Sequence, residues 1–163
     1  MKIYLIGMPG SGKSSLGVKL ALALKYEFLD MDSYIEKKEN RSIPDIFKSN
    51  GEAYFRKLEK EALADFKNMD NLVISTGGGV IKDKNNKLLF DGLCVFLNVD
   101  LKTLENRIKN QNNDRPLLKT KTIKELYDER IDLYNYFKDV EVINNDIDLS
   151  IQKIMEMIKW KKY

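Results

Sequence analysis

The sequence has no histidine and only one cysteine among its 163 residues. A lone cysteine cannot form an internal disulfide, and without histidine the common Cys/His zinc sites are excluded. The lack of histidine also excludes Ser/His and Cys/His nucleophile pairs, so a general base, where one is needed, must be a carboxylate, a lysine or a tyrosine. The cysteine, Cys94, lies in the apolar run 93–97, which favours an inert core thiol over a reactive one.

Long hydrophobic runs are also missing. No stretch approaches the roughly 18 apolar residues that cross a bilayer, and the first apolar run, 3–6, is too short for a signal peptide and lacks its small-residue cleavage site. We therefore expect a cytoplasmic protein with no membrane contact. With 43% hydrophobic and 33% charged residues the chain has a globular composition, and its length predicts a single domain, 1–163.

Arginine is scarce among the cations. The chain has 23 lysines but only five arginines, which are Arg41, Arg56, Arg107, Arg115 and Arg130. A chain that uses lysine at ordinary surface positions is expected to keep arginine where a planar, bidentate donor is needed, as for carboxylates and phosphates. The net charge of +3 is spread along the chain, and the lysine-rich end 159–163 is more typical of a solvated helix end than of a nucleic-acid patch. We expect no nucleic-acid partner.

Short apolar runs alternate with longer amphipathic stretches. The runs are brief and rich in branched residues, as buried strands are, and they cover 3–6, 27–29, 72–74, 93–97 and 140–143. Apolar residues at helical spacing predict helices over 14–24, 53–66, 101–108, 123–137 and 149–160. Alternating strands and helices with short connections predict a three-layer α/β domain with a mostly parallel sheet that is covered on both faces.

Two segments depart from this alternation. Residues 31 to about 60 place two or more helices between the second and third strands, which is more than one crossover needs. Residues 110–121 are polar and rich in asparagine, which is typical of a mobile loop. Ligands of such sheets bind at the carboxyl ends of the strands, and both segments are expected to project there.

The segment Gly7–Ser14 matches the phosphate-binding loop pattern G-x-x-x-x-G-K-[ST], directly after a predicted strand and before a predicted helix. In this motif backbone N–H groups and the helix N-terminus bind phosphate oxygens, Lys13 reaches the β- and γ-phosphates, and the Ser14 hydroxyl ligates Mg²⁺. The predicted nucleotide contacts are Gly10, Ser11, Gly12, Lys13, Ser14 and Ser15. The motif predicts that the chain binds a nucleoside triphosphate.

Two further motifs follow the second and third predicted strands. Because alternate residues leaving a strand point to the same side, Asp30 and Asp32 are both expected to face the phosphate loop. One carboxylate can hold a Mg²⁺-bound water and the other can orient or deprotonate an acceptor hydroxyl, although a helix cap explains either aspartate equally well. The triple glycine 77–79 favours a close approach of the backbone to another group over a flexible turn.

In combination these motifs resemble those of the shikimate kinase family, and the resemblance extends over nearly the whole chain. The phosphate loop alone is generic, whereas the ordered combination is highly specific. The motifs that carry the resemblance are the phosphate loop, Asp30-Met-Asp32, Gly51-Glu-Ala-Tyr-Phe-Arg56 with Leu58-Glu59, Gly77-Gly-Gly79, Arg115-Pro-Leu-Leu118 and Arg130 before Leu133-Tyr134.

The resemblance implies a P-loop kinase fold with a five-stranded parallel sheet in the order 2-3-1-4-5, a helical substrate-binding insertion at about 31–60 and a mobile lid at about 110–121. It implies transfer of the γ-phosphoryl group of MgATP to the 3-hydroxyl of shikimate, a step of chorismate and aromatic amino acid biosynthesis. The partners would be shikimate, ATP and one Mg²⁺ ion, and we expect a monomer.

The family's site residues carry over to matching positions of this chain. The metal site would be Ser14 and Asp30. The catalytic residues would be Lys13, Asp32 and Arg115, of which Arg115 would also bind ATP. Shikimate would be bound by Asp32, Arg56, Gly77, Gly78, Gly79 and Arg130. Glu59 lies three residues after Arg56 on a helix and would hold its guanidinium in position. Adenine contacts would come from Arg107 or Lys109 and the loop 144–146.

Two other functions are compatible with the phosphate loop. One is another metabolite kinase, such as a gluconate or nucleoside monophosphate kinase, which turnover assays with candidate acceptors would distinguish. The other is a nucleotide-dependent switch or binding module without a small acceptor. In that protein Arg56 and Arg130 would bind no acceptor, and shikimate would not shift the melting temperature.

Overall fold

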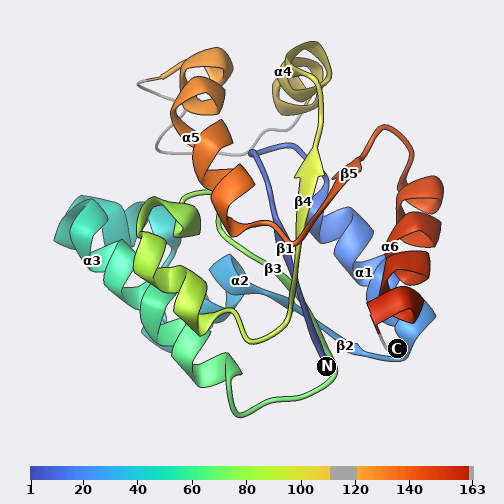
Figure 1. Ribbon diagram of the computed structural model, residues 1–163. Coiled ribbons are helices and arrows are strands. Elements are labelled where there is room, and N and C mark those ends of the chain that lie inside the picture. Colours follow the sequence, from blue (N-terminus) through green and yellow to red (C-terminus); the bar gives the residue numbers. More distant parts are fainter. Residues whose placement is uncertain (111–120, 162–163) are drawn as a thin grey trace.

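Figure 1 shows the computed structural model, which describes residues 1–110 and 121–161. Within these residues five strands form one parallel sheet in the order β2-β3-β1-β4-β5. The strands are β1 (Lys2–Ile6), β2 (Glu27–Asp30), β3 (Leu72–Ser75), β4 (Leu93–Asn98) and β5 (Val140–Ile143). The fold class, the parallel sheet and the strand order predicted above are confirmed.

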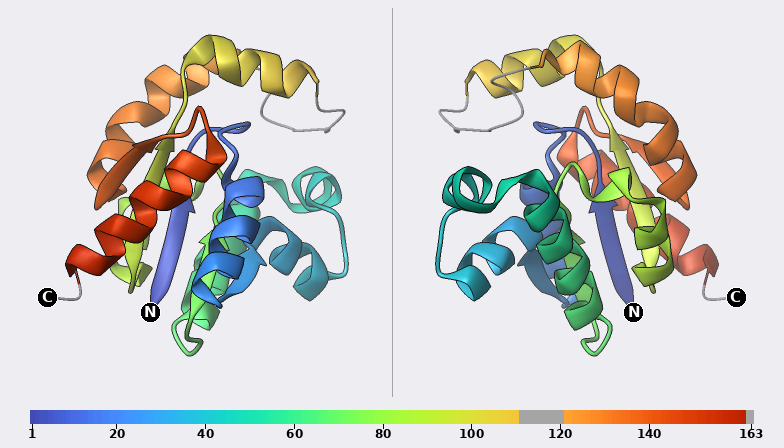
Figure 2. Two further views of the ribbon diagram at one scale, coloured as in Figure 1. Left: turned by 90° about the vertical axis from the view of Figure 1, so that its right-hand side faces the viewer. Right: turned by 90° about the vertical axis from the view of Figure 1, so that its left-hand side faces the viewer.

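Helices cover both faces of the sheet (Figures 1 and 2). One face carries α1 (Lys13–Leu24) and α6 (Ile147–Lys161), and the other carries α3 (Ile43–Phe66), α5 (Ile123–Phe137) and the 3₁₀ helices η1 (Val80–Lys82) and η2 (Lys84–Leu89). The remaining helices, α2 (Met31–Glu39) and α4 (Leu101–Lys109), follow the carboxyl ends of β2 and β4. None of the helices in the described part of the chain combines the length and apolar character that spanning a bilayer requires.

The alternation of side chains along β1 builds a separate core on each face. Tyr4 and Ile6 point into the core beneath α3 and α5, whereas Ile3 and Leu5 point into the core beneath α1 and α6. All four side chains are fully buried. This explains why the strand is apolar throughout, as strands that are covered on both faces are.

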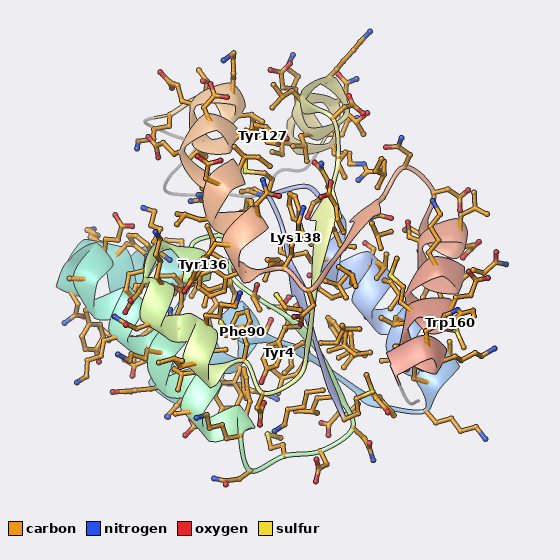
Figure 3. The ribbon with its side chains drawn as sticks, viewed as in Figure 1. Tyr4, Phe90, Tyr127, Tyr136, Lys138 and Trp160 are labelled. Atoms are coloured by element: carbon orange, nitrogen blue, oxygen red, sulfur yellow. The ribbon has the colours of Figure 1, made fainter. Side chains whose placement is uncertain are left out.

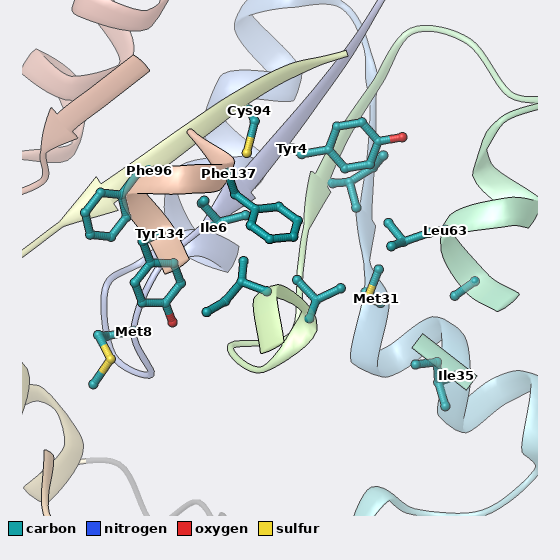
Figure 4. Packing of buried hydrophobic residues seen from close by; sticks show 14 of the residues in the cluster. Tyr4, Ile6, Met8, Met31, Ile35, Leu63, Cys94, Phe96, Tyr134 and Phe137 are labelled. Atoms are coloured by element: carbon teal, nitrogen blue, oxygen red, sulfur yellow. The ribbon is translucent and has the colours of Figure 1, made fainter. Parts of the chain in front are cut away.

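Aromatic rings and one thiol fill the core beneath α5 (Figure 4). Phe96 stacks on Tyr134 with ring centroids 4.9 Å apart. At the other end of this core Tyr4 stacks on Phe90 with centroids 4.6 Å apart (Figure 3). Cys94 is 2% exposed, and burial raises the pKa of its thiol, which agrees with the inert core thiol predicted from the sequence.

The segment between β2 and β3 forms α2 and α3, which pack against each other. The side chain of Ser42 caps α3 by accepting from Asp45 N at 3.3 Å. Gly51, with φ 81° and ψ 177°, interrupts the helical geometry inside α3. The regular part of α3 that follows this interruption carries Arg56 and Glu59.

Most of the predicted lid, residues 110–121, lies outside the described residues. Arg115 lies there too. The lid and the role of this arginine therefore stay predictions.

Candidate active site

The phosphate-binding loop connects β1 to α1 at the carboxyl end of the sheet. Gly10 and Gly12 have φ angles of 80° and 90°, which glycine adopts without strain. The loop closes around Lys13, whose Nζ donates to the carbonyl oxygens of Gly7 and Met8 at 2.9 and 3.0 Å. A loop of this shape at the start of a helix can bind phosphate oxygens through its backbone N–H groups and its lysine.

Two residues from other elements support this loop. Arg107 of α4 donates from Nη1 to Gly10 O at 3.3 Å and from Nη2 to Asn144 O at 3.1 Å. The fully buried Asn144, directly after β5, donates from Nδ2 to Ser11 O at 2.8 Å. Arg107 and Asn144, which we expected near adenine, thus contact the phosphate loop itself, whereas the alternative Lys109 is exposed.

Asp30 has two roles. Its Oδ1 accepts from Ser33 N at 3.1 Å and caps α2, as the capping interpretation predicted. Its Oδ2 accepts from Ser14 Oγ at 2.9 Å. Ser75 Oγ, at the end of β3, lies 3.3 Å from the same Ser14 hydroxyl. The cap therefore fixes the carboxylate with its second oxygen at the phosphate loop.

Ser14, Asp30 and Ser75 offer only oxygen donors, the kind that Mg²⁺ prefers. In the ranges 1–110 and 121–161 no three His, Cys, Asp or Glu side chains gather as a metal site. One carboxylate and two hydroxyls suit an ion that takes most of its ligands from water and phosphate, as Mg²⁺ does. The residues present therefore fit a magnesium ion that binds together with a nucleotide.

Charged side chains fill the space around the triple glycine 77–79, which follows β3. A Cβ on the first glycine would lie 2.5 Å from Glu59 Oε1, and one on the second would lie 3.0 Å from Arg130 Nη1. On the third glycine it would lie 2.5 Å from Arg56 Cζ. The predicted close approach is thus present, and the groups that approach are side chains of α3 and α5.

The two arginines are fixed at this turn by hydrogen bonds. Arg56 Nη1 donates to Glu59 Oε2 at 2.6 Å. Arg130, which is 2% exposed, donates from Nη1 to Gly78 O at 2.8 Å. The hydroxyl of Tyr134 donates to the same carbonyl oxygen at 3.0 Å. Two guanidinium groups from different helices therefore meet at one turn of the backbone.

Polar atoms without partners remain beside these arginines. Arg130 Nε and Glu59 Oε1 are buried and have no hydrogen-bond partner within the described ranges. Leaving such an atom unpaired costs about 1 to 3 kcal/mol. Asp32 adds a further carboxylate here, because its Oδ1 would lie 3.1 Å from a Cβ on Gly77. This set of donors and acceptors is suited to a polar ligand.

The predicted phosphate-, metal- and shikimate-binding residues of the described ranges line a single cavity of about 620 Å³, with the exception of the fully buried Ser11. Arg107, Lys109 and residues 144–146, which we expected near adenine, do not line it. The cavity also has an apolar part that we did not predict, formed by Ile43, Pro44, Phe47, Phe55 and Leu126. Apolar residues of an amphipathic helix show the same spacing whether they face a core or a ligand, so spacing alone could not predict this part of the cavity.

Comparison with known proteins identifies the family. A family model described as shikimate kinase matches residues 9–159. The chain belongs to the shikimate kinase family. The curated shikimate kinase of Sulfurihydrogenibium sp. (strain YO3AOP1) is 46% identical over 136 residues, which are 81% of each chain. That of Clostridium botulinum (strain Langeland / NCTC 10281 / Type F) is 44% identical over 166 aligned residues, which cover 98% of this chain and 97% of that protein.

Solved shikimate kinases have the same fold. The structure of shikimate kinase from Acinetobacter baumannii in complex with shikimate has a TM-score of 0.91 at 34% identity, and the match covers 99% of this chain and 94% of that one. Deoxyadenosine kinase from M. mycoides with bound dATP has a TM-score of 0.64 at 20% identity and covers 98% of this chain and all of that one. This second likeness shows a shared fold alone.

The buried carboxyl of Glu59 predicts a pH dependence of stability. Burial raises the pKa of Glu59 to about 7, and Arg56 opposes this shift only in part. Because the folded-state pKa lies above the ordinary value of 4.5, the protonated carboxyl of Glu59 favours the folded state. Its contribution to the free energy of unfolding is complete below pH 4.5 and is lost as the pH rises to about 7. Relative to Glu59→Gln, the free energy of unfolding of the wild type should fall by ~1 to 3 kcal/mol over this window.

Urea denaturation of both proteins at several pH values measures this difference. The Glu59→Gln variant is the reference for the wild type, because every other titrating group is common to the two proteins. A difference that stays constant, or that grows in favour of the wild type as the pH rises, would contradict the raised pKa.

Proposed function

We propose that this chain transfers the γ-phosphoryl group of MgATP to the 3-hydroxyl of shikimate, giving shikimate 3-phosphate and ADP. The observation that carries the proposal is the presence of two fixed arginines, Arg56 and Arg130, in the same cavity as a phosphate-binding loop. The loop supports nucleotide binding in general, whereas the arginine pair supports a small acidic acceptor. Family membership and a solved relative with shikimate support the identity of that acceptor.

The cavity contains groups that match each part of shikimate, which has one carboxylate and three hydroxyls. We assign the carboxylate to Arg56 and Arg130 at the glycine turn 77–79, because guanidinium groups pair with carboxylates through two N–H donors. Asp32 would accept hydrogen bonds from hydroxyl groups. The apolar part of the cavity, which includes Phe47, would contact the ring.

The phosphate loop would bind the phosphates of ATP through Lys13 and the backbone from Gly10 to Ser15. Ser14 directly, and Asp30 through water, would hold Mg²⁺, and the bound ion would neutralise charge on the phosphate oxygens. The contacts that Asn144 and Arg107 make with the loop support a preformed nucleotide site. A preformed site needs little reorganisation when the nucleotide binds.

Phosphoryl transfer requires alignment of the two substrates, neutralisation of charge and exclusion of water. Asp32 would orient the 3-hydroxyl toward the γ-phosphate and accept its proton where a base is needed. Lys13 would stabilise the charge on the transferred group. By family resemblance Arg115 would bring a second cation from the lid.

Release of ADP in the presence of ATP and Mg²⁺ tests this function directly. We expect shikimate to raise the rate at least about a hundredfold above that with ATP alone, and gluconate or a nucleoside monophosphate to leave it unchanged. Lys13→Met should keep the melting temperature but lose most of the turnover, because a positive charge at the γ-phosphate is removed. ADP release that does not depend on shikimate would refute the proposed function. Near-normal turnover by the folded Lys13→Met variant would refute the role assigned to Lys13.

The carboxylate assignment predicts a loss of shikimate affinity in Arg56→Ala and in Arg130→Ala. Each variant should lose about 1.5 to 3 kcal/mol of shikimate binding, the scale of a hydrogen bond to a charged group, with ATP affinity unchanged. Titration calorimetry measures both. Arg41→Ala is a matched control, because Arg41 bonds to Glu39 and Asn50 and does not line the cavity. Unchanged shikimate affinity in both test variants would mean that the carboxylate is held elsewhere.

A further inference from the structure

Arg56 has a second acidic partner, Glu52, one turn earlier on α3. Glu52 Oε1 accepts from Arg56 Nη2 at 2.9 Å and from Nε at 3.3 Å. Lys82 Nζ, at the end of η1, donates to the same oxygen at 2.8 Å. One carboxylate oxygen thus joins two cations from different elements. Neither Glu52 nor Lys82 is among the described residues that line the cavity.

Side-chain exposure rises along these ion pairs from Glu59 through Arg56 to Glu52. The side chain of Glu59 is 1% exposed, that of Arg56 is 20% exposed and that of Glu52 is 42% exposed. Arg56 is therefore held between a buried carboxylate and an exposed one. The hydrogen bond from Lys82 and that from Arg56 lower the pKa of Glu52 to about 2, so this partner stays ionised at neutral pH.

Some N–H groups of Arg56 remain available to a ligand. The guanidinium group has five N–H donors. Glu52 accepts from Nε and from one N–H of Nη2, and Glu59 accepts from one N–H of Nη1. Within the part of the chain that the structure describes, these contacts leave one N–H on each terminal nitrogen. Two such donors are the number that a bidentate carboxylate pair requires.

Lys82 also connects this pair to the glycine turn. Its backbone N–H donates to Gly79 O at 3.0 Å, and the guanidinium of Arg56 lies against the same glycine. Glu52, Lys82, Gly79 and Arg56 therefore form a closed circuit of contacts between α3 and the turn. An isolated surface ion pair contributes little because its side chains move freely, and a closed circuit removes that freedom.

We propose that Glu52, held in place by Lys82, is a positioning residue for Arg56 and directs its two remaining N–H groups toward the carboxylate of the acceptor. This inference rests on the function proposed above. Gly51 interrupts the helical geometry of α3 directly before Glu52, so Glu52 starts the regular part that carries Arg56. The two residues therefore keep a fixed spacing of one helical turn, at which their side chains meet.

Shikimate affinity in variants of Glu52 tests this role. Glu52→Ala removes the acceptor and should raise the Kd for shikimate about tenfold, with the KM for ATP unchanged. Glu52→Gln keeps an oxygen that accepts from the same donors and should stay within about threefold of the wild type. Glu61→Ala is the matched control, because Glu61 pairs with Lys57 at 3.6 Å on the same helix, and it should have no effect.

A double-mutant cycle shows whether Glu52 acts through Arg56. In an Arg56→Ala background, Glu52→Ala should cause no further loss of shikimate affinity. A full additional loss there, or a wild-type or tighter Kd in Glu52→Ala alone, would overturn the positioning role. A tighter Kd would mean that Glu52 competes with the acceptor's carboxylate. If the wild type itself binds no shikimate, the proposed function fails, and that outcome is distinct from a failure of Glu52 in an active enzyme.

Discussion

The site depends on the absence of side chains at one turn, the triple glycine 77–79. Glu59, Arg130 and Arg56 lie against its three members in turn. None of the three glycines has a positive φ angle, so they are needed for space and not for an unusual backbone conformation. Because β3 lies next to β1 in the sheet, the turn at its end comes beside the phosphate loop. Two arginines and the nucleotide loop are thereby brought to one cavity.

The charges around this turn are arranged in two layers. The outer carboxylate, Glu52, has a pKa of about 2, whereas burial gives the inner one, Glu59, a pKa of about 7. The outer group thus supplies a constant negative charge to Arg56, and the inner group is partly protonated near neutral pH. Arg130 adds a second cation, which is almost fully buried. This balance keeps the inner part of the cavity favourable for an anionic acceptor.

Local patterns in the sequence predicted the alternating strands and helices and the phosphate loop, because these features are encoded by short spacings. The strand order and the roles of Arg56 and Arg130 were implied by the family resemblance instead, and those roles stay predictions. Contacts between distant segments were harder to predict. Asn144 lies 133 residues from Ser11, whose carbonyl it binds, and Lys82 lies 30 residues from Glu52. Neither pair forms a motif, since their meeting depends on how helices pack over the sheet. Asp30 shows a different limit, because the sequence could not reveal that one carboxylate caps α2 with one oxygen and contacts Ser14 with the other.

We propose that the paired arginines at the glycine turn bind the carboxylate of the acceptor. Titration calorimetry with shikimate and with its methyl ester, in the wild type and in Arg56→Ala, tests this by changing the ligand's charge. We expect the ester to bind the wild type at least about tenfold more weakly than shikimate does, and this preference to shrink in the variant. An equal preference for the free carboxylate in both proteins would contradict it.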